Sequence, residues 1–167
     1  MRRPLRSILV VLALIGAMLA IDAVPAAAQE QLICRKRAKK LDNGNDHKNF
    51  GPGRQVVNGG GGSDVLRGGR GNDLIVGGHG NDKVYGGPGN DIVCGGIGDD
   101  AVHGNDGRDE VYGEEDNDRV WGDEGSDYVL GSAGRDFVYG WLKRDGVYVD
   151  AGIDTIDGGY TLSLIHI

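Results

Sequence analysis

Hydrophobic and polar positions alternate with a period of nine residues from Gly59 to Asp157. Successive units read GGRGNDLIV, GGHGNDKVY and GGPGNDIVC, and eleven such units follow one another without a gap. A fixed internal period is typical of repeat architectures in which each unit stacks on the next. The eighth position of every unit is aliphatic: Leu66, Ile75, Val84, Val93, Val102, Val111, Val120, Val129, Val138, Val147 and Ile156.

Each unit predicts a turn followed by a very short strand. The first six positions are rich in glycine, which permits positive φ, and the last three positions favour a pleated strand. Because side chains alternate along a strand, the eighth position points into a core and the seventh and ninth point outward. With two units per coil, residues 59–157 are predicted to form an all-β fold, a parallel β-roll or β-solenoid of nine-residue repeats.

The sixth position is aspartate in every unit: Asp64, Asp73, Asp82, Asp91, Asp100, Asp109, Asp118, Asp127, Asp136, Asp145 and Asp154. With two units per coil, alternate aspartates line up about 4.8 Å apart along the same edge of the roll. Six of them form one row and five form the other. Such rows of carboxylates repel one another unless a cation lies between them.

Calcium fits these rows because it accepts six to eight hard oxygen ligands, and glycine turns expose backbone carbonyls beside each carboxylate. The gaps between successive aspartates allow at most nine Ca²⁺ ions, five in one row and four in the other. Zinc does not fit, since the repeats hold one cysteine and two histidines with no ligand spacing. A glycine-rich, charged chain with a thin core is expected to be disordered without calcium and to fold on binding it.

The repeats resemble the nonapeptide repeats of the RTX, or haemolysin-type calcium-binding, family. The resemblance implies a parallel β-roll with calcium between adjacent coils, bound by the sixth-position aspartates and by carbonyls of the turns. The match is uneven, because non-glycine residues take over the second position after Gly104: Asn105, Glu114, Asp123, Ser132, Trp141 and Asp150. Lys143 also replaces a fourth-position glycine. Sites beside Asp145 therefore depart furthest from the repeat pattern.

The segments on either side of the repeats differ from them in composition. Residues 1–28 are expected to be a secretory signal peptide, with Arg2, Arg3 and Arg6 before an apolar run and an Ala-Ala-Ala cleavage site. The alternative is a membrane anchor, although the apolar run is shorter than the roughly 20 residues that a span needs. Residues 29–58 form a basic and polar arm or cap. Residues 158–167 are a degenerate end, of which 162–167 are either a sequencing-adapter artefact or a short cap strand.

The net charge, the two cysteines and a column of aromatic residues indicate which partners the chain could bind. A formal net charge of −7 disfavours nucleic acid and favours cations, and no membrane span is expected once the signal is removed. In an oxidising compartment Cys34 and Cys94 could pair as a disulfide, or they could remain free or bond between chains. Ninth-position residues Tyr85, His103, Trp121 and Tyr139 predict an outward aromatic ladder, which stacks across strands or binds a carbohydrate or cell-surface partner.

The sequence as a whole predicts a secreted, extracellular calcium-binding repeat protein with a structural or interaction role and no enzymatic activity. The alternative is a C-terminally truncated fragment of a secreted RTX-type hydrolase, toxin or adhesin. The H-E-x-x-H and G-x-S-x-G motifs of metalloproteases and serine hydrolases do not occur in the chain.

Overall fold

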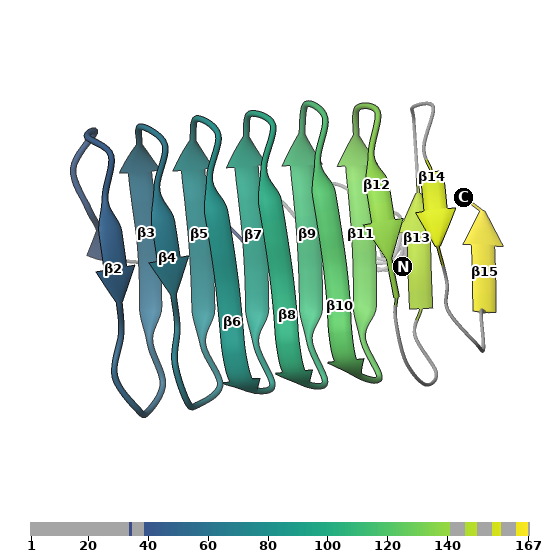
Figure 1. Ribbon diagram of the computed structural model, residues 1–167, viewed down its shortest axis with the longest axis horizontal. Helices are drawn as coiled ribbons and strands as arrows, with labels where there is room; N and C mark the ends of the chain where they lie inside the picture. Colours follow the sequence, from purple (N-terminus) through teal and green to yellow (C-terminus); the bar gives the residue numbers. More distant parts are fainter. Residues whose placement is uncertain (1–33, 35–38, 141–145, 150–154, 158–162, 167) are drawn as a thin grey trace, which may run out of the picture. The chain divides into compact units, whose positions relative to one another are not determined.

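The chain coils back and forth between two facing parallel sheets in the computed structural model, which describes Cys34 and residues 39–140, 146–149, 155–157 and 163–166 (Figure 1). Sheet A has the order β1-β3-β5-β7-β9-β11-β13-β15 and sheet B the order β14-β12-β10-β8-β6-β4-β2. Successive strands therefore alternate between the sheets, and two nine-residue units complete one coil. All the strand pairs are parallel, which confirms the predicted β-roll.

The strands of sheet A are β1 (Lys39–Lys40), β3 (Val56–Gly61), β5 (Leu74–His79), β7 (Ile92–Ile97), β9 (Glu110–Glu115), β11 (Tyr128–Ala133), β13 (Gly146–Val149) and β15 (Ser163–His166). Those of sheet B are β2 (His47–Asn49), β4 (Val65–Arg67), β6 (Lys83–Gly89), β8 (Ala101–Gly107), β10 (Arg119–Gly125), β12 (Phe137–Tyr139) and β14 (Thr155–Asp157). Among the described residues no helix has the length and apolar character needed to cross a membrane.

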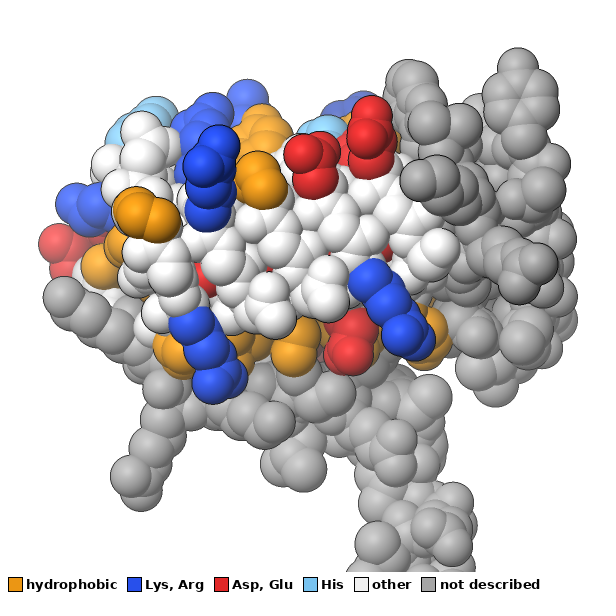
Figure 2. Space-filling model, turned by 90° about the horizontal axis from the view of Figure 1, so that it is seen from below, with side chains coloured by type: hydrophobic (Ala, Val, Ile, Leu, Met, Phe, Trp, Pro, Cys, Tyr) orange, Lys and Arg blue, Asp and Glu red, His pale blue; other side chains and the backbone are white. Residues whose placement is uncertain are grey.

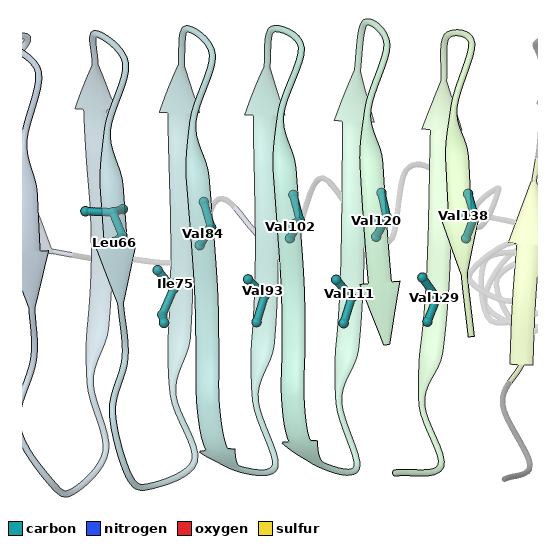
Figure 3. Packing of buried hydrophobic residues seen from close by; sticks show 9 residues of the cluster. All are labelled: Leu66, Ile75, Val84, Val93, Val102, Val111, Val120, Val129 and Val138. Carbon is teal, nitrogen blue, oxygen red and sulfur yellow. The ribbon is translucent and has the colours of Figure 1, made fainter. Parts of the chain in front are cut away.

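The core is the column of eighth-position side chains between the sheets (Figure 3). Nine of them are fully buried: Leu66, Ile75, Val84, Val93, Val102, Val111, Val120, Val129 and Val138. The register places each one beside the residue 18 positions away, as in the pairs Val84↔Val102 and Val93↔Val111. Close contact between β-branched side chains along the roll fixes this register, because a one-residue slip would turn every valine toward solvent.

Most central strands are longer than the sequence predicted. β5, for example, continues past the ninth position of its unit through Gly77 and Gly78 to His79. The glycine pairs keep hydrogen bonding to the next coil, as in Gly78↔Gly96, so they belong to the sheet as well as to the turn. The prediction of three-residue strands was wrong because it assigned all glycine-rich positions to the turns.

The solenoid also extends toward the N-terminus beyond the counted repeats. β2 pairs with β4 through His47↔Val65, and β3 begins at Val56, three residues before Gly59. Residues 41–49 read LDNGNDHKN and place Asp46 in the phase of the sixth-position aspartates. This part of the predicted arm or cap therefore forms one further coil, whereas the predicted signal at 1–28 lies outside the described residues.

The outer face of sheet A carries a second hydrophobic cluster. It consists of Cys34, Leu74, Val76, Cys94, Tyr112 and Leu130. Cys94 stands outside the core column, as its ninth position predicted, yet its side chain is completely buried. Cys34 and Cys94 form a disulfide, which ties Cys34 to β7 in the middle of sheet A.

Candidate metal centre

The sixth-position aspartates form two continuous rows along the roll, one on each side. In the first row the backbone N–H of Asp64 donates to Oδ1 of Asp82 at 2.7 Å, and that of Asp82 donates to Oδ1 of Asp100 at 2.7 Å. The second row repeats this contact from Asp73 to Asp91 at 2.8 Å. The predicted alignment of aspartates 18 residues apart is therefore present wherever these residues are described; Asp145 and Asp154 lie outside the described residues.

The second carboxylate oxygen, Oδ2, is left without a hydrogen-bond partner in most of these residues. The unpartnered buried Oδ2 atoms belong to Asp46, Asp64, Asp73, Asp82, Asp91, Asp100, Asp109 and Asp118. Asp100 is only 3% exposed and Asp118 is fully buried. A buried carboxylate oxygen normally has a hydrogen-bond partner. Because the same oxygen lacks one in coil after coil, these atoms point to a ligand.

Glycine at the first position makes room beside this oxygen in the units from Gly59 to Gly131. A Cβ placed on Gly95 would lie 2.5 Å from Oδ2 of Asp100 and 2.6 Å from the carbonyl oxygen of Gly113 in the next coil. The same is true one coil earlier, where a Cβ on Gly77 would lie 2.5 Å from both Asp82 Oδ2 and the Gly95 carbonyl. A carboxylate oxygen and a backbone carbonyl oxygen thus face the same small space between successive coils.

This donor set fits calcium and does not fit zinc. Carboxylate and backbone carbonyl oxygens are the hard ligands that Ca²⁺ prefers, and none of the donors is sulfur or imidazole. In the described part of the chain no three His, Cys, Asp or Glu side chains converge on one point. A cation at these positions would take at most two of these carboxylates and would complete its shell with backbone carbonyls.

Burial makes the aspartate rows unfavourable as bare anions. Desolvation raises the pKa of Asp82 and Asp91 to about 6 and that of Asp109 to about 7. The same cause raises the pKa of Asp100 and Asp118 to about 8. The hydrogen bond from the neighbouring backbone N–H opposes this shift, and the negative charge of the next aspartate in the row adds to it. A bound cation would offset the desolvation cost and screen the repulsion between neighbouring aspartates.

The non-glycine residues at the second position keep the glycine conformation. Asn105, Glu114, Asp123 and Ser132 have φ values of 73°, 83°, 66° and 72°. Asp116, at the fourth position of its unit, has a φ of 81°. Each such residue costs on the order of 1–2 kcal/mol relative to glycine. The departures from the repeat pattern thus strain the turns without changing their path, while Trp141, Lys143 and Asp150 lie outside the described residues.

Two parts of this arrangement were missed from the sequence. Asp46 belongs to the first row, because its backbone N–H donates to Oδ1 of Asp64 at 2.7 Å. A further ladder runs along the fifth position in the opposite direction, where the N–H of Asn90 donates to Oδ1 of Asn72 at 3.1 Å. The fifth-position Asn and Asp residues, and the GND triplet ending at Asp46, were the signals that could have revealed both.

Figure 2 shows the roll from the side of its lower turns, where backbone and uncharged side chains form most of the described surface. Because the sixth-position aspartates are buried, this edge presents few carboxylates to solvent. A metal would therefore bind within the coils rather than on their surface.

The ninth-position aromatic residues of sheet B form the predicted outward ladder. Tyr85 and His103 stack with ring centroids 5.0 Å apart, His103 and Trp121 at 4.2 Å, and Trp121 and Tyr139 at 5.5 Å. The Arg67 guanidinium covers the Tyr85 ring at 4.7 Å. Ring faces are thus taken up by neighbouring rungs, and the ring edges are what the ladder presents to solvent.

A parallel solenoid with a buried aspartate in each turn defines a class of protein, the metal-binding β-roll. Within that class the chain belongs to the family of RTX calcium-binding nonapeptide repeats, whose model matches residues 58–93, 95–129 and 121–156. The chain is thus a calcium-binding repeat protein. No curated protein and no solved structure gives a significant match to it.

Proposed function

We propose that the chain is an exported module whose β-roll folds when the sixth-position aspartates bind calcium. The observation that carries this proposal is the buried, unpartnered Oδ2 beside a carbonyl of the next coil, repeated along both rows. Each ion would be held by one such carboxylate and by turn carbonyls. Bound calcium supplies positive charge where the fold otherwise buries like charges.

The role we propose is structural or interactive rather than catalytic. The residues that the repeats hold in fixed positions are aspartates committed to the coils and aromatic residues committed to a ladder. Export supports a calcium-dependent fold, since extracellular sites commonly bind calcium with dissociation constants of about 10⁻⁴ to 10⁻³ M. The amino-terminal sequence and the disulfide both suit an oxidising compartment.

The ligand assignment is tested by calorimetric calcium titration of Asp100→Asn and Gly95→Ala. The first variant removes the charge of the buried carboxylate, and the second places a methyl group between its Oδ2 and the facing carbonyl. We expect each variant to bind about one calcium ion fewer per chain, or to bind that ion with an affinity at least about tenfold lower. The reason is that a contact to a charged group contributes about 1.5–3 kcal/mol.

Asp99→Asn and Gly51→Ala are the matched controls. Asp99 is the exposed neighbour of Asp100, and a Cβ on Gly51 meets no atom within 4 Å. Both controls should keep the wild-type stoichiometry. If Asp100→Asn and Asp99→Asn bind the same number of calcium ions with the same affinity, the sixth-position aspartates are not calcium ligands.

A further inference from the structure

The coil at residues 41–58 is built like two of the repeats, yet the residues that would bind calcium are changed. Its two sixth positions carry Asp46 and Gln55, and its two first positions carry Leu41 and Phe50 in place of glycine. The coil lies at the end of the roll, where β2 is the edge strand of sheet B (Figure 1). The end coils of a solenoid have a neighbour on one side only and therefore require a cap.

Asp46 receives a cation from its own coil. Nζ of Lys48 lies 3.0 Å from Oδ1 of Asp46, and the side chain of Asp46 is only 12% exposed. Further along the row the same oxygen accepts a backbone N–H, as Oδ1 of Asp82 does from Asp64 at 2.7 Å. The ammonium group of Lys48 thus brings to Asp46 a positive charge that the other aspartates of the row can obtain from a metal.

Leu41 takes the place of the glycine that makes room beside Oδ2. In the repeats a Cβ at this position meets the carboxylate, since a Cβ on Gly77 would lie 2.5 Å from Oδ2 of Asp82. Leu41 instead carries a full side chain, which packs against the hydrophobic core. Oδ2 of Asp46 is buried and has no hydrogen-bond partner, like its counterparts along the row. At Asp46, however, the charge is already paired with Lys48, and leucine replaces the glycine that would leave space for a metal.

Gln55 replaces the aspartate in the second half of this coil. Its side chain is uncharged, and Nε2 donates to the carbonyl oxygens of Gly53 at 3.0 Å and Gly51 at 3.4 Å. Turn carbonyls of this kind are the groups that would complete a calcium shell in the repeats. The amide of Gln55 thus provides these carbonyls with a donor from the protein itself. The backbone N–H of Gln55 still donates to Oδ1 of Asp73 at 2.7 Å, so the coil keeps its place in the second row.

We propose that residues 41–58 form a metal-independent cap that closes the calcium-binding roll at this end. As it rests on the proposed function, the cap is defined by contrast with the repeats: Lys48 and Gln55 take the place of the calcium that the repeats bind. The backbone of the cap still pairs with the repeats, since the N–H of Asp46 donates to Oδ1 of Asp64 at 2.7 Å. The first repeats therefore receive their hydrogen bonds from a coil that binds no calcium.

Lysine also ends the eighth-position column at this end of the roll. Lys48 stands opposite Leu66 in the register of β2 with β4, and Lys39 stands opposite Val57 in the register of β1 with β3. β1 and β2 are the edge strands of their sheets. A charged residue at an inward position of an edge strand opposes pairing with a further strand. The sequence of the cap therefore suits a closed end and not a surface on which another solenoid stacks.

Calorimetric calcium titration of the full chain tests the cap by the number of ions bound. Asp46→Asn should bind as many ions as the wild type, whereas Asp82→Asn, in the same row of the repeats, should bind about one fewer. Leu41→Gly/Lys48→Val restores the residue types of a repeat around Asp46 and, once circular dichroism shows it folded, should bind about one ion more than the wild type. Loss of an ion in Asp46→Asn, or an unchanged count in folded Leu41→Gly/Lys48→Val, overturns the proposal.

Thermal unfolding in saturating calcium tests the role of Lys48 separately. Lys48→Met leaves the carboxylate of Asp46 without its ammonium partner and should lower the melting temperature by about 2–5 °C. Asp46→Asn/Lys48→Met removes both charges and should recover at least about half of that loss. Lys83→Met, at an exposed lysine of β6, is the matched control and should melt with the wild type. A Lys48→Met variant that also melts with the wild type overturns the proposal.

The two measurements separate the cap from the proposed function. If Asp82→Asn keeps every ion, the proposed function is wrong, because Asp82 lies in the repeats and outside the cap. The melting temperatures then decide the cap by themselves. Recovery in Asp46→Asn/Lys48→Met supports the pairing of Lys48 with Asp46, and a double variant no more stable than Lys48→Met overturns it.

Discussion

The two oxygens of each buried aspartate have different surroundings. Oδ1 accepts a hydrogen bond from the preceding coil in its row, for example from the N–H of Asp100 to Oδ1 of Asp118 at 2.8 Å. Oδ2 of the same residue has no hydrogen-bond partner and faces the space beside Gly113. One atom therefore holds the coils in register, and the other remains available to a cation.

The raised pKa values predict how the metal-free chain responds to pH. Folding raises the pKa of Asp100 from 3.8 to about 8 and that of Asp82 to about 6, so the folded form binds protons more tightly than the unfolded form. The stabilisation from protonation is fully present below pH 3.8 and is lost as the pH rises through about 6 to about 8. Circular dichroism in a chelator should therefore show more β-structure at pH 4 than at pH 8.

Calcium should reverse this dependence, because the metal binds the deprotonated carboxylate and competes with the proton. Calcium midpoints measured at pH 6 and pH 8 provide the comparison, with tighter binding expected at pH 8. If the metal-free chain instead loses β-structure on acidification from pH 8 to pH 4, protonation of the buried aspartates does not stabilise the fold.

At the residue scale the sequence predicted the two rows of aspartates, but not that Oδ1 accepts a hydrogen bond while Oδ2 has no hydrogen-bond partner. The period of nine places Asp82 beside Asp100 whatever the details of the turn. Which oxygen accepts the hydrogen bond from the N–H of the preceding coil depends on the path of the turn and on the coil spacing, and neither can be read from residue types. The left-handed conformation of Glu114 was equally hidden, since glutamate has no preference for it.

At the scale of single elements, the β-strands are held by two kinds of side-chain column, one inside and one outside. The inner column is almost uniformly valine and packs without polar atoms. The outer column of sheet B stacks ring on ring, with interplanar angles of 9°, 3° and 8° along the ladder. Stacking at this spacing adds to the backbone hydrogen bonds of short, glycine-containing strands.

Trp121→Ala should destabilise the calcium-bound roll by about 1–3 kcal/mol, because two ring contacts of about 0.5–1.5 kcal/mol each are lost. Thermal unfolding in saturating calcium measures the effect. Ile97→Ala is the matched control, since Ile97 is a large hydrophobic residue with 39% of its surface exposed. If both variants melt at the wild-type temperature, the ladder is not a source of stability.

Strand existence and direction were predictable, whereas strand length was not. Valine and isoleucine at the eighth position mark where each strand must pass the core. The glycines that follow read as turn residues, yet Gly77 and Gly78 continue β5 because a parallel neighbour on each side offers them hydrogen-bond partners. Pairing between coils is a tertiary effect that overrides local preference.

At the scale of the described solenoid, one narrow core column and one covalent bond hold the coils. The disulfide joins Cys34 to Cys94 across a sequence separation of 60 residues. The bridge was predictable only as a possibility, because a count of two cysteines gives no distance between them. The first coil, at 41–58, was overlooked because Leu41 and Phe50 replace the first-position glycine, Lys48 stands at an eighth position and Gln55 at a sixth.

Removing the disulfide should make folding require more calcium. Closing a loop of this length restricts the unfolded chain by up to about 4 kcal/mol, so Cys34→Ser/Cys94→Ser loses that contribution. Calcium-induced folding followed by circular dichroism should show a higher midpoint for the variant. Wild-type protein without reductant is the reference, and identical midpoints would mean that the bond does not constrain the roll.

The coupling of calcium binding to folding is the central claim, and far-ultraviolet circular dichroism of the purified chain during a calcium titration at pH 7.5 tests it most directly. Magnesium at the same concentrations is the control, because it demands a smaller octahedral site and releases its water reluctantly. A transition from coil to β-structure driven by calcium and not by magnesium is the expected result. A β-spectrum that is complete in chelator and unchanged by calcium would contradict the claim.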